Sequence, residues 1–286
     1  MKRIVIKVGS SVLTETASIA KERMLNLVSL IADARKKYEV ILVSSGAVAA
    51  GYTAVQLNRS MPTSKKVLAS VGQPILMSSY KAQFDIYDVA ISQILLTEED
   101  FDSRVHTKIF QEIIERTLKN DILPIVNEND ISTTPDQLFG DNDQLSAHVA
   151  YYTGADMLVI LSDIDGYYDS NPKDNPKAKI RKLVSEIKDE ELDQSHTPNS
   201  KFATGGIVTK LKAAQYIMNK SREMFLCNGF DLTSAREFLI KGIHNKGTLF
   251  TNKHERKADK ETKIIISNSK KSTMTQLENI SIEKEG

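Results

Sequence analysis

The stretch ILPIVNENDISTTPDQLFGDNDQLSAHVAYY, residues 122–152, decides the fold class because it joins a strand, a polar loop and a helix. Its first five residues, Ile122–Val126, form the short apolar run expected of a buried strand. Its last eight, Leu145–Tyr152, have the pattern of a helix. The intervening residues 127–144 include five carboxylates and no Lys or Arg. Ligands of open α/β sheets bind where such a loop follows the carboxyl end of a strand, so this loop is the first candidate site.

Two compact acidic clusters stand within this loop, NEND at 127–130 and GDND at 140–143. An acidic, solvated loop with two turns explains NEND alone equally well. Two clusters in one loop favour a binding site, because carboxylates that repel one another need a facing cation. That cation is either a lysine of the chain or a positively charged group of a ligand.

Short apolar runs alternate with helical patterns along the rest of the chain. The near-continuous apolar runs predict buried strands at 3–8, 39–44, 90–96, 157–161, 222–226 and 247–250. Apolar residues at helical spacing predict helices at 21–37, 105–120, 208–219 and 235–241. This alternation predicts an α/β fold, a three-layer α/β/α sandwich with a mostly parallel central sheet.

Size, charge and cysteine content exclude several classes of protein. The chain has 286 residues, 41% of them hydrophobic, which is ample for a core. Its formal net charge of +1 argues against a broad nucleic-acid-binding surface. The single cysteine, Cys227, excludes a disulfide framework and fits a reducing cytosol. We find no signal peptide and no apolar stretch near about 20 residues, so we expect a soluble, cytoplasmic protein without a membrane partner.

The composition changes near residue 250. From Asn252 onward the sequence is rich in Lys, Glu, Ser and Thr, with a single apolar run at 264–266. Such a segment is too polar to build a core. We therefore expect one domain at residues 1–250, followed by a polar, mobile tail at 251–286.

Three turns of small residues have the composition of phosphate-binding turns. Lys7 precedes the turn at 9–11 (GSS), and the turn at 44–47 (SSGA) follows a strand in the same way. The third turn, with its double glycine, opens a helix at 203–210 that carries Lys210. Backbone N–H groups at such turns and at helix N-termini bind phosphate. Each turn alone also fits ordinary chain reversal, and the GxxxxGK[ST] pattern of a Walker A loop is absent.

A further strand ends in SDIDGYY at 162–168, which has two acids and a glycine. These residues suit a ribose, or magnesium through water, although an ordinary strand-to-loop turn is the favoured explanation of this stretch taken alone. The five histidines are scattered without the i,i+4 spacing of a helical metal site. Neither a zinc site nor a Ser-His-Asp triad is supported.

Two lysines, two glycine-rich turns and a carboxylate loop at strand ends fit transfer of a phosphoryl group from a nucleotide to a small acceptor. Phosphoryl transfer needs positioning and charge stabilisation, with little covalent chemistry by the protein. A lysine on each side of the moving group, with an aspartate that orients both, would satisfy that need.

These motifs resemble, in order and spacing, those of the amino acid kinase family over nearly all of residues 1–250. The matching stretches are KVGSSVLT (7–14), SSGAVAAG (44–51), SVGQPILM (70–77), NEND (127–130), FGDND (139–143), SDIDGYY (162–168), TGGIVTK (204–210) and GTLF (247–250). Within the family, NEND followed by FGDND is typical of members that phosphorylate the side-chain carboxylate of L-glutamate, the first step of proline biosynthesis. The resemblance thus implies a kinase that uses ATP, Mg²⁺ and L-glutamate.

The resemblance also implies roles for individual residues. Lys7 and Lys210 would contact the nucleotide phosphates and the transferring group, and Asp143 would orient both lysines. The positions that match glutamate-binding residues are Ser45, Asp130 and Asn142. The positions that match ATP-binding residues are Lys7, Ser162, Asp163, Thr204, Gly205, Gly206, Ile207, Val208, Thr209 and Lys210. No residue is assigned as a metal ligand.

The chain departs from the family pattern at two places. Ile207 stands where the family usually has methionine, which we expect to be harmless in a packing role. Many members carry a C-terminal RNA-modification-type (PUA) domain, which the tail at 251–286 is too short to form. The family also leads us to expect a dimer or tetramer, with proline as a feedback inhibitor.

Two alternative functions stay open at this point. The first is a sibling kinase that acts on another acid, such as N-acetylglutamate. The second is a non-catalytic sensor of nucleotide or amino acid that keeps the fold. Intact Lys7, Asp143 and Lys210 argue against the sensor, because a sensor has no need of them.

Overall fold

The computed structural model describes residues 1–15, 18–58, 60–133, 142–172, 175–192 and 206–252. The predictions for Thr204, Gly205 and the polar tail from residue 253 lie outside these residues. Across the described ranges, no helix has the combination of length and apolar character needed to cross a lipid bilayer.

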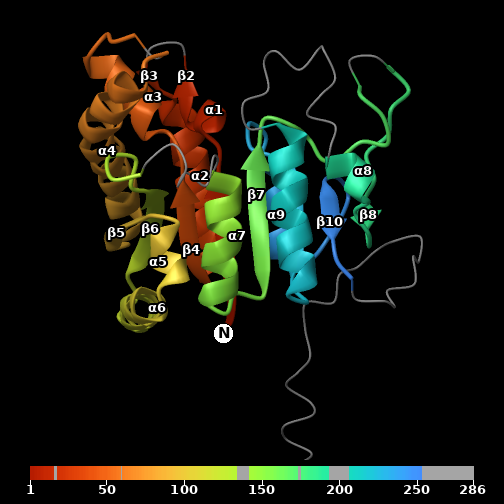
Figure 1. Cartoon of the computed structure of the whole chain (residues 1–286). Coiled ribbons are helices and arrows are strands. Elements are labelled where there is room, and N and C mark those ends of the chain that lie inside the picture. The colour runs from red at the N-terminus through yellow and green to blue at the C-terminus, as the bar shows by residue number, and fades with distance from the viewer. Residues whose placement is uncertain (16–17, 59, 134–141, 173–174, 193–205, 253–286) are drawn as a thin grey trace, which may run out of the picture.

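An eight-stranded sheet runs through the middle of the molecule in the order β5-β6-β4-β1-β7-β9-β10-β8 (Figure 1). The six strands from β5 to β9 in this order pair in parallel, β10 is antiparallel to β9, and β8 is parallel to β10. In chain order the strands are β1 (Lys2–Val8), β4 (Tyr38–Ser44), β5 (Ile91–Leu96), β6 (Leu123–Glu128), β7 (Met157–Ser162), β8 (Leu183–Val184), β9 (Glu223–Asn228) and β10 (Thr248–Phe250). The mostly parallel sheet is therefore confirmed. A separate ribbon pairs β2 (Thr14–Glu15) with β3 (Ser18–Ile19).

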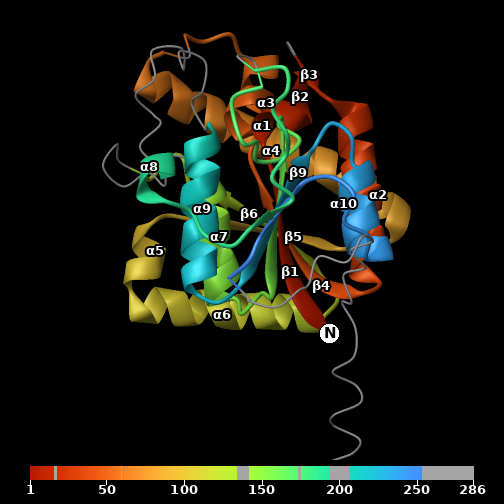
Figure 2. The same ribbon diagram turned by 90° about the vertical axis from the view of Figure 1, so that its right-hand side faces the viewer.

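Helices cover both faces of this sheet (Figures 1 and 2). Alternate residues of β1 enter two different cores: Ile4 and Ile6 face one layer of helices, and Val5 faces the other. The first layer includes α2 (Lys21–Arg35), α4 (Pro62–Phe84), α10 (Thr233–Arg236) and η4 (Glu237–Lys241). The second includes α5 (Glu99–Asp102), α6 (Arg104–Lys119), α7 (Asn142–Tyr152) and α9 (Ile207–Asn219). The predicted three-layer sandwich is confirmed. Short elements at its margins are α1 (Ser10–Leu13), α3 (Ala47–Ala54), η1 (Asp85–Tyr87) and α8 (Asp189–Leu192).

The sequence prediction was wrong between β4 and β5. The predicted turn at 44–47 leads directly into α3 at Ala47, and neither α3 nor the 23-residue helix α4 was predicted. Gly51, Gly72 and Pro74 obscure the pattern, because glycine and proline are the poorest helix formers. A Cβ atom on Gly72 would lie 1.8 Å from the carbonyl oxygen of Ala47 in α3. Glycine is therefore needed here because the two helix backbones touch.

The contact between α3 and α4 gives a test. We expect Gly72→Ala to lower the free energy of unfolding by about 2–3 kcal/mol, because a rigid helix backbone must shift to admit the methyl group. The exposed Ser70 lies on the same helix, and Ser70→Ala should change stability by less than about 0.5 kcal/mol. Urea unfolding followed by circular dichroism measures both values. Equal stability of the two variants would contradict the close contact.

Candidate active site

The described site residues gather at one end of the sheet. The parallel strands β1, β4, β6 and β7 all end at the upper edge in Figure 1, and α7 and α9 begin there. Strand ends supply Lys7, Ser45, Asp130, Ser162 and Asp163, whereas the first turns of α7 and α9 supply the rest. The topology therefore assembles residues that lie far apart in the sequence.

An ionic cluster of Lys7, Asp143 and Lys210 lies at the centre of this edge. Lys7 Nζ donates to Asp143 Oδ1 at 2.5 Å, and Lys210 Nζ donates to Asp143 Oδ2 at 3.1 Å. Asp143 is fully buried, and each lysine is 5% exposed. Lys7 alternates with Val5 along β1 and so faces the layer that holds α7 and α9. One carboxylate thus fixes an ammonium group from β1 and another from α9.

Electrostatics keep Asp143 ionised. Burial by itself raises the pKa of this carboxyl, but the Lys7 and Lys210 ammonium groups outweigh burial and hold the pKa below its usual value. A carboxyl whose pKa is lower in the folded protein adds stability at neutral pH, and that contribution is lost as the pH falls through the lowered pKa. The three side chains carry a formal net charge of +1 at neutral pH (two ammonium groups and one carboxylate), which suits an anionic ligand.

The start of α9 adds neutral contacts to the ionic cluster. Thr209 Oγ1 donates to Asp143 Oδ2 at 3.1 Å, and Gln144 Nε2 donates to the carbonyl oxygen of Thr209 at the same distance. These bonds hold the first turn of α9 against the first turn of α7. Gly206 is the N-cap of α9 and has an extended backbone. The positive end of the helix dipole, at Gly206–Lys210, therefore lies beside the cluster.

A second group of polar residues surrounds Asn142. This side chain lies in the first turn of α7, three residues before the predicted helix start at Leu145. Asn142 Nδ2 donates to the carbonyl oxygen of Ser44 at 3.1 Å and to Asn127 Oδ1 at 2.8 Å. Ser45, which follows Ser44 in the chain, begins the turn into α3. The turn passes through Gly46, whose φ of +112° favours glycine. Two of the three predicted glutamate-binding residues, Ser45 and Asn142, thus belong to adjoining segments.

Asp130 lies just beyond the end of β6 and is half-buried. Burial raises the pKa of its carboxyl, while a backbone hydrogen bond and the Lys66 ammonium act in the opposite direction. Lys66 Nζ also donates to the carbonyl oxygens of Ile131 at 2.9 Å and Thr133 at 2.6 Å. A partly desolvated carboxylate of this kind favours a cationic partner. Sequence reasoning missed Lys66, for which no motif offered a signal.

At the end of β7, the buried Ser162 donates through Oγ to Asp163 Oδ1 at 2.9 Å. Asp163 itself is exposed. The structure therefore places these two predicted nucleotide-binding residues beside the end of β1, on the strand that pairs with it. The described part of the glycine turn, Gly206 onward, lies in α9, whereas Thr204 and Gly205 fall outside the described residues.

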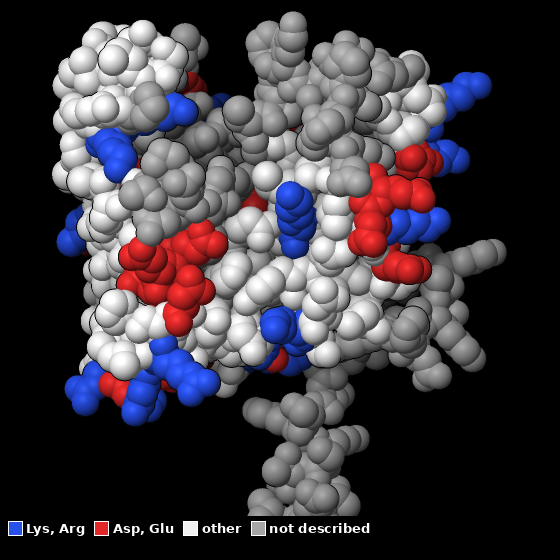
Figure 3. Space-filling model, in the orientation of Figure 1, with Lys and Arg blue, Asp and Glu red and all other residues white. Residues whose placement is uncertain are grey.

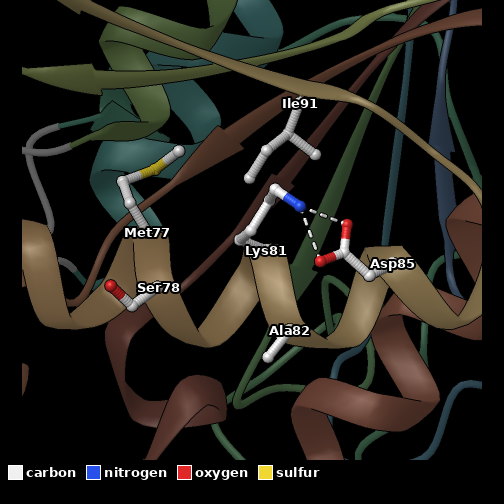
Figure 4. A pocket seen from close by; sticks show the side chains of 6 residues that line it. All are labelled: Met77, Ser78, Lys81, Ala82, Asp85 and Ile91. Carbon is white, nitrogen blue, oxygen red and sulfur yellow. Dashed lines mark hydrogen bonds and ion pairs between the residues drawn. The ribbon is translucent and has the colours of Figure 1, made fainter.

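An open groove on the outer side of α4 lies apart from these residues. Figure 4 shows this groove of about 450 Å³, in which Lys81 Nζ contacts Asp85 Oδ1 at 2.5 Å. Its lining residues are Met77, Ser78, Lys81, Ala82, Asp85 and Ile91, and none of the predicted site residues is among them. On the face drawn in Figure 3, acidic side chains gather over α5 and α8.

The sequence of the chain matches a model of a known protein family. A model described as the amino acid kinase family matches residues 2–228. The chain belongs to this family. A glutamate 5-kinase of Wolinella succinogenes is 50% identical over 255 residues, which cover 87% of this chain and 98% of the relative. A glutamate 5-kinase of Leishmania donovani is 48% identical over 250 residues, which cover 87% and 95%.

Two solved structures of kinases share the fold. UMP kinase from Ureaplasma parvum superposes with a TM-score of 0.60 at 17% identity, covering 87% of this chain and 98% of that structure. Carbamate kinase from Giardia lamblia bound to AMP-PNP gives a TM-score of 0.59 at 16% identity, covering 87% and 98%. At this level of identity the likeness supports the three-layer fold alone.

The ionic cluster predicts unequal losses of stability when its members are removed. We expect Asp143→Asn to lower the free energy of unfolding by about 3–5 kcal/mol, because two buried ammonium groups lose the carboxylate between them. Lys7→Met should cost less, since Asp143 keeps its bonds to Lys210 and Thr209. Urea midpoints at pH 7 measure both. A larger loss in Lys7→Met would show that Asp143 is not the centre of the cluster.

Proposed function

We propose that this chain is a glutamate 5-kinase, which transfers the γ-phosphoryl group of ATP to the side-chain carboxylate of L-glutamate. The products are glutamyl 5-phosphate and ADP, and the reaction is the first step of proline biosynthesis. The observation that carries the proposal is the buried carboxylate of Asp143, which bridges Lys7 and Lys210. The identity of 50% and 48% to two glutamate 5-kinases supports this choice of acceptor.

In the proposed reaction, a carboxylate oxygen of glutamate attacks the γ-phosphorus as the bond to the ADP oxygen breaks. The acceptor needs no general base, because a carboxylic acid is ionised at neutral pH. Lys7 and Lys210 would instead stabilise negative charge on the moving group, from β1 on one side and α9 on the other. Asp143 orients both ammonium groups in advance, so little reorganisation accompanies the transfer.

We assign the two substrates to different parts of this edge. ATP would bind along the ends of β1 and β7 and the start of α9, where Ser162, Asp163 and the turn from Thr204 to Lys210 lie. L-glutamate would bind between Ser45, Asp130 and Asn142. The Asp130 carboxylate is suited to the α-ammonium group, because a cation restores the solvation that burial removes.

We propose Mg²⁺ as the cation that accompanies ATP. Mg²⁺ keeps several waters and binds mainly through substrate phosphates in kinases, which neutralises charge on them. Within the described residues, no three His, Cys, Asp or Glu side chains form a metal-binding group. Both oxygens of Asp143 accept hydrogen bonds from the protein, so we assign this carboxylate to binding the two lysines and not to binding the metal.

We further propose that residues 1–250 form the catalytic domain, since β1 and β10 belong to one sheet. A cytoplasmic location, a homodimer or homotetramer and feedback inhibition by proline also belong to this proposal, supported by the family resemblance.

Kinetic variants test the assigned roles. We expect Lys7→Ala and Lys210→Ala each to lower kcat by about 10²–10³-fold, because each removes a preorganised charge from the transition state. Asn142→Ala should mainly raise the KM for glutamate, since it removes a substrate contact. Steady-state ADP release measures both constants. Lys81→Ala, in the groove on α4, is the matched control and should leave them unchanged. Near-normal kcat in both lysine variants would refute their roles.

The choice of acceptor has a direct test. We expect acyl phosphate from L-glutamate with ATP and Mg²⁺, and at least about 100-fold less from N-acetylglutamate. Acetylation removes the positive charge that would pair with Asp130 and leaves a desolvated carboxylate without a partner. Hydroxylamine traps either product as a hydroxamate, which is measured by its iron complex. A preference for N-acetylglutamate would overturn the proposed substrate and favour the sibling kinase.

A further inference from the structure

Four side-chain amides form a hydrogen-bonded chain from the proposed glutamate site, here called the acceptor site, to the surface of the protein. Asn142 Nδ2 donates to Asn127 Oδ1 at 2.8 Å, and Asn127 Nδ2 donates to Gln73 Oε1 at 2.9 Å. Gln73 Nε2 then donates to Gln93 Oε1 at 3.3 Å. The four residues come from α7, β6, α4 and β5. Asn127 is 4% exposed, Gln73 is half-buried and Gln93 is exposed, so this hydrogen-bonded chain runs from a buried site to solvent.

Backbone groups fix the direction of this hydrogen-bonded chain. The Glu128 backbone N–H, which can only donate, bonds to Asn127 Oδ1 at 2.9 Å. The Ser44 carbonyl, which can only accept, bonds to Asn142 Nδ2. Both asparagines therefore have a defined amide orientation. The Asn127 amide nitrogen is directed to Gln73 Oε1, and Asn142 presents Oδ1 as the acceptor for other donors.

We propose that Gln73 is a positioning residue for the acceptor site. By accepting from Asn127 Nδ2, it anchors the nitrogen of an amide whose Oδ1 accepts from the Glu128 N–H, and Asn127 in turn holds Asn142. This inference rests on the proposed function, in which Asn142 binds L-glutamate. With the glutamine acceptor removed, Asn127 Nδ2 loses this partner and the amide keeps only its bonds at Oδ1, from the Glu128 N–H and Asn142 Nδ2. The Asn127 side chain then gains freedom to rotate and holds Asn142 less firmly.

The place of Gln73 in the fold suits this role. It lies next to Gly72, whose missing side chain lets α4 touch α3, and α3 begins two residues after Ser45. Asn127 continues the row of Leu123 and Ile125 on β6, which face the same layer as α4. The contact between α3 and α4 thus sets the distance at which Gln73 meets Asn127.

Three variants of the full chain test the proposal by steady-state kinetics and by calorimetric titration with L-glutamate. Gln73→Met keeps the length of the side chain but removes the acceptor, so the KM and Kd for glutamate should rise about tenfold, as for one hydrogen bond. The KM for ATP should stay within about twofold. Gln73→Glu keeps an acceptor for Asn127, and the exposed Gln93 can turn its amide nitrogen toward it. This variant should stay within about threefold of the parent chain.

Gln83→Met is the matched control, because Gln83 is a half-buried glutamine of the same helix. A purely structural role would give the opposite order, with the new charge of Gln73→Glu more harmful than Gln73→Met. That order, or an unchanged glutamate KM in Gln73→Met, would overturn the role of Gln73 while leaving the proposed function intact. A parent chain that releases no ADP with glutamate would overturn the proposed function, and this inference with it.

Discussion

The contact between Asp143 and two lysines is the constraint on which the site depends. A buried aspartate flanked by two ammonium groups stays ionised, as its lowered pKa shows. Its position ties β1 in the central layer to α7 and α9 in one outer layer. A buried ion pair adds little net stability once desolvation is counted, because removing charges from water costs several kcal/mol each. The cluster is therefore better explained by preorganised charge at the sheet edge than by folding.

The second constraint is the close contact between α3 and α4, which involves two glycines. Cβ atoms on Gly51 and Gly72 would lie 1.9 Å and 1.8 Å from backbone oxygens of the facing helix. This contact holds the start of α3, which follows the Ser45 turn, against α4, which carries Gln73. Close packing of the two helix backbones thus positions the acceptor half of the site, at Ser45 and Asn142. Ion pairs position the phosphate half, at Lys7, Asp143 and Lys210.

The sequence predicted most of the sheet and the ionic cluster, but not the helices between β4 and β5. Buried strands such as β1 and β7 show as continuous apolar runs, and parallel pairing brings their ends together. Lys7 stands out as a charge inside an apolar run, whereas the role of Asp143 followed from the family resemblance. By contrast, Gly72 and Pro74 oppose helix formation locally and make sense only with α3 in place. Likewise, the partners of Asn127 lie 15 and 54 residues away, so no local pattern shows them.

The two halves of the site also differ in how they handle charge. The acceptor carboxylate and the phosphoryl group repel each other, so any fixed negative charge between them would oppose their approach. The side chains of Asn142 and Asn127 orient groups by dipoles alone and add no such charge. Asp130, an acid of that half, has a raised pKa because it is partly buried. A bound ammonium group would lower this pKa again, so in the proposed function the amine of glutamate itself supplies the charge that completes the acceptor site.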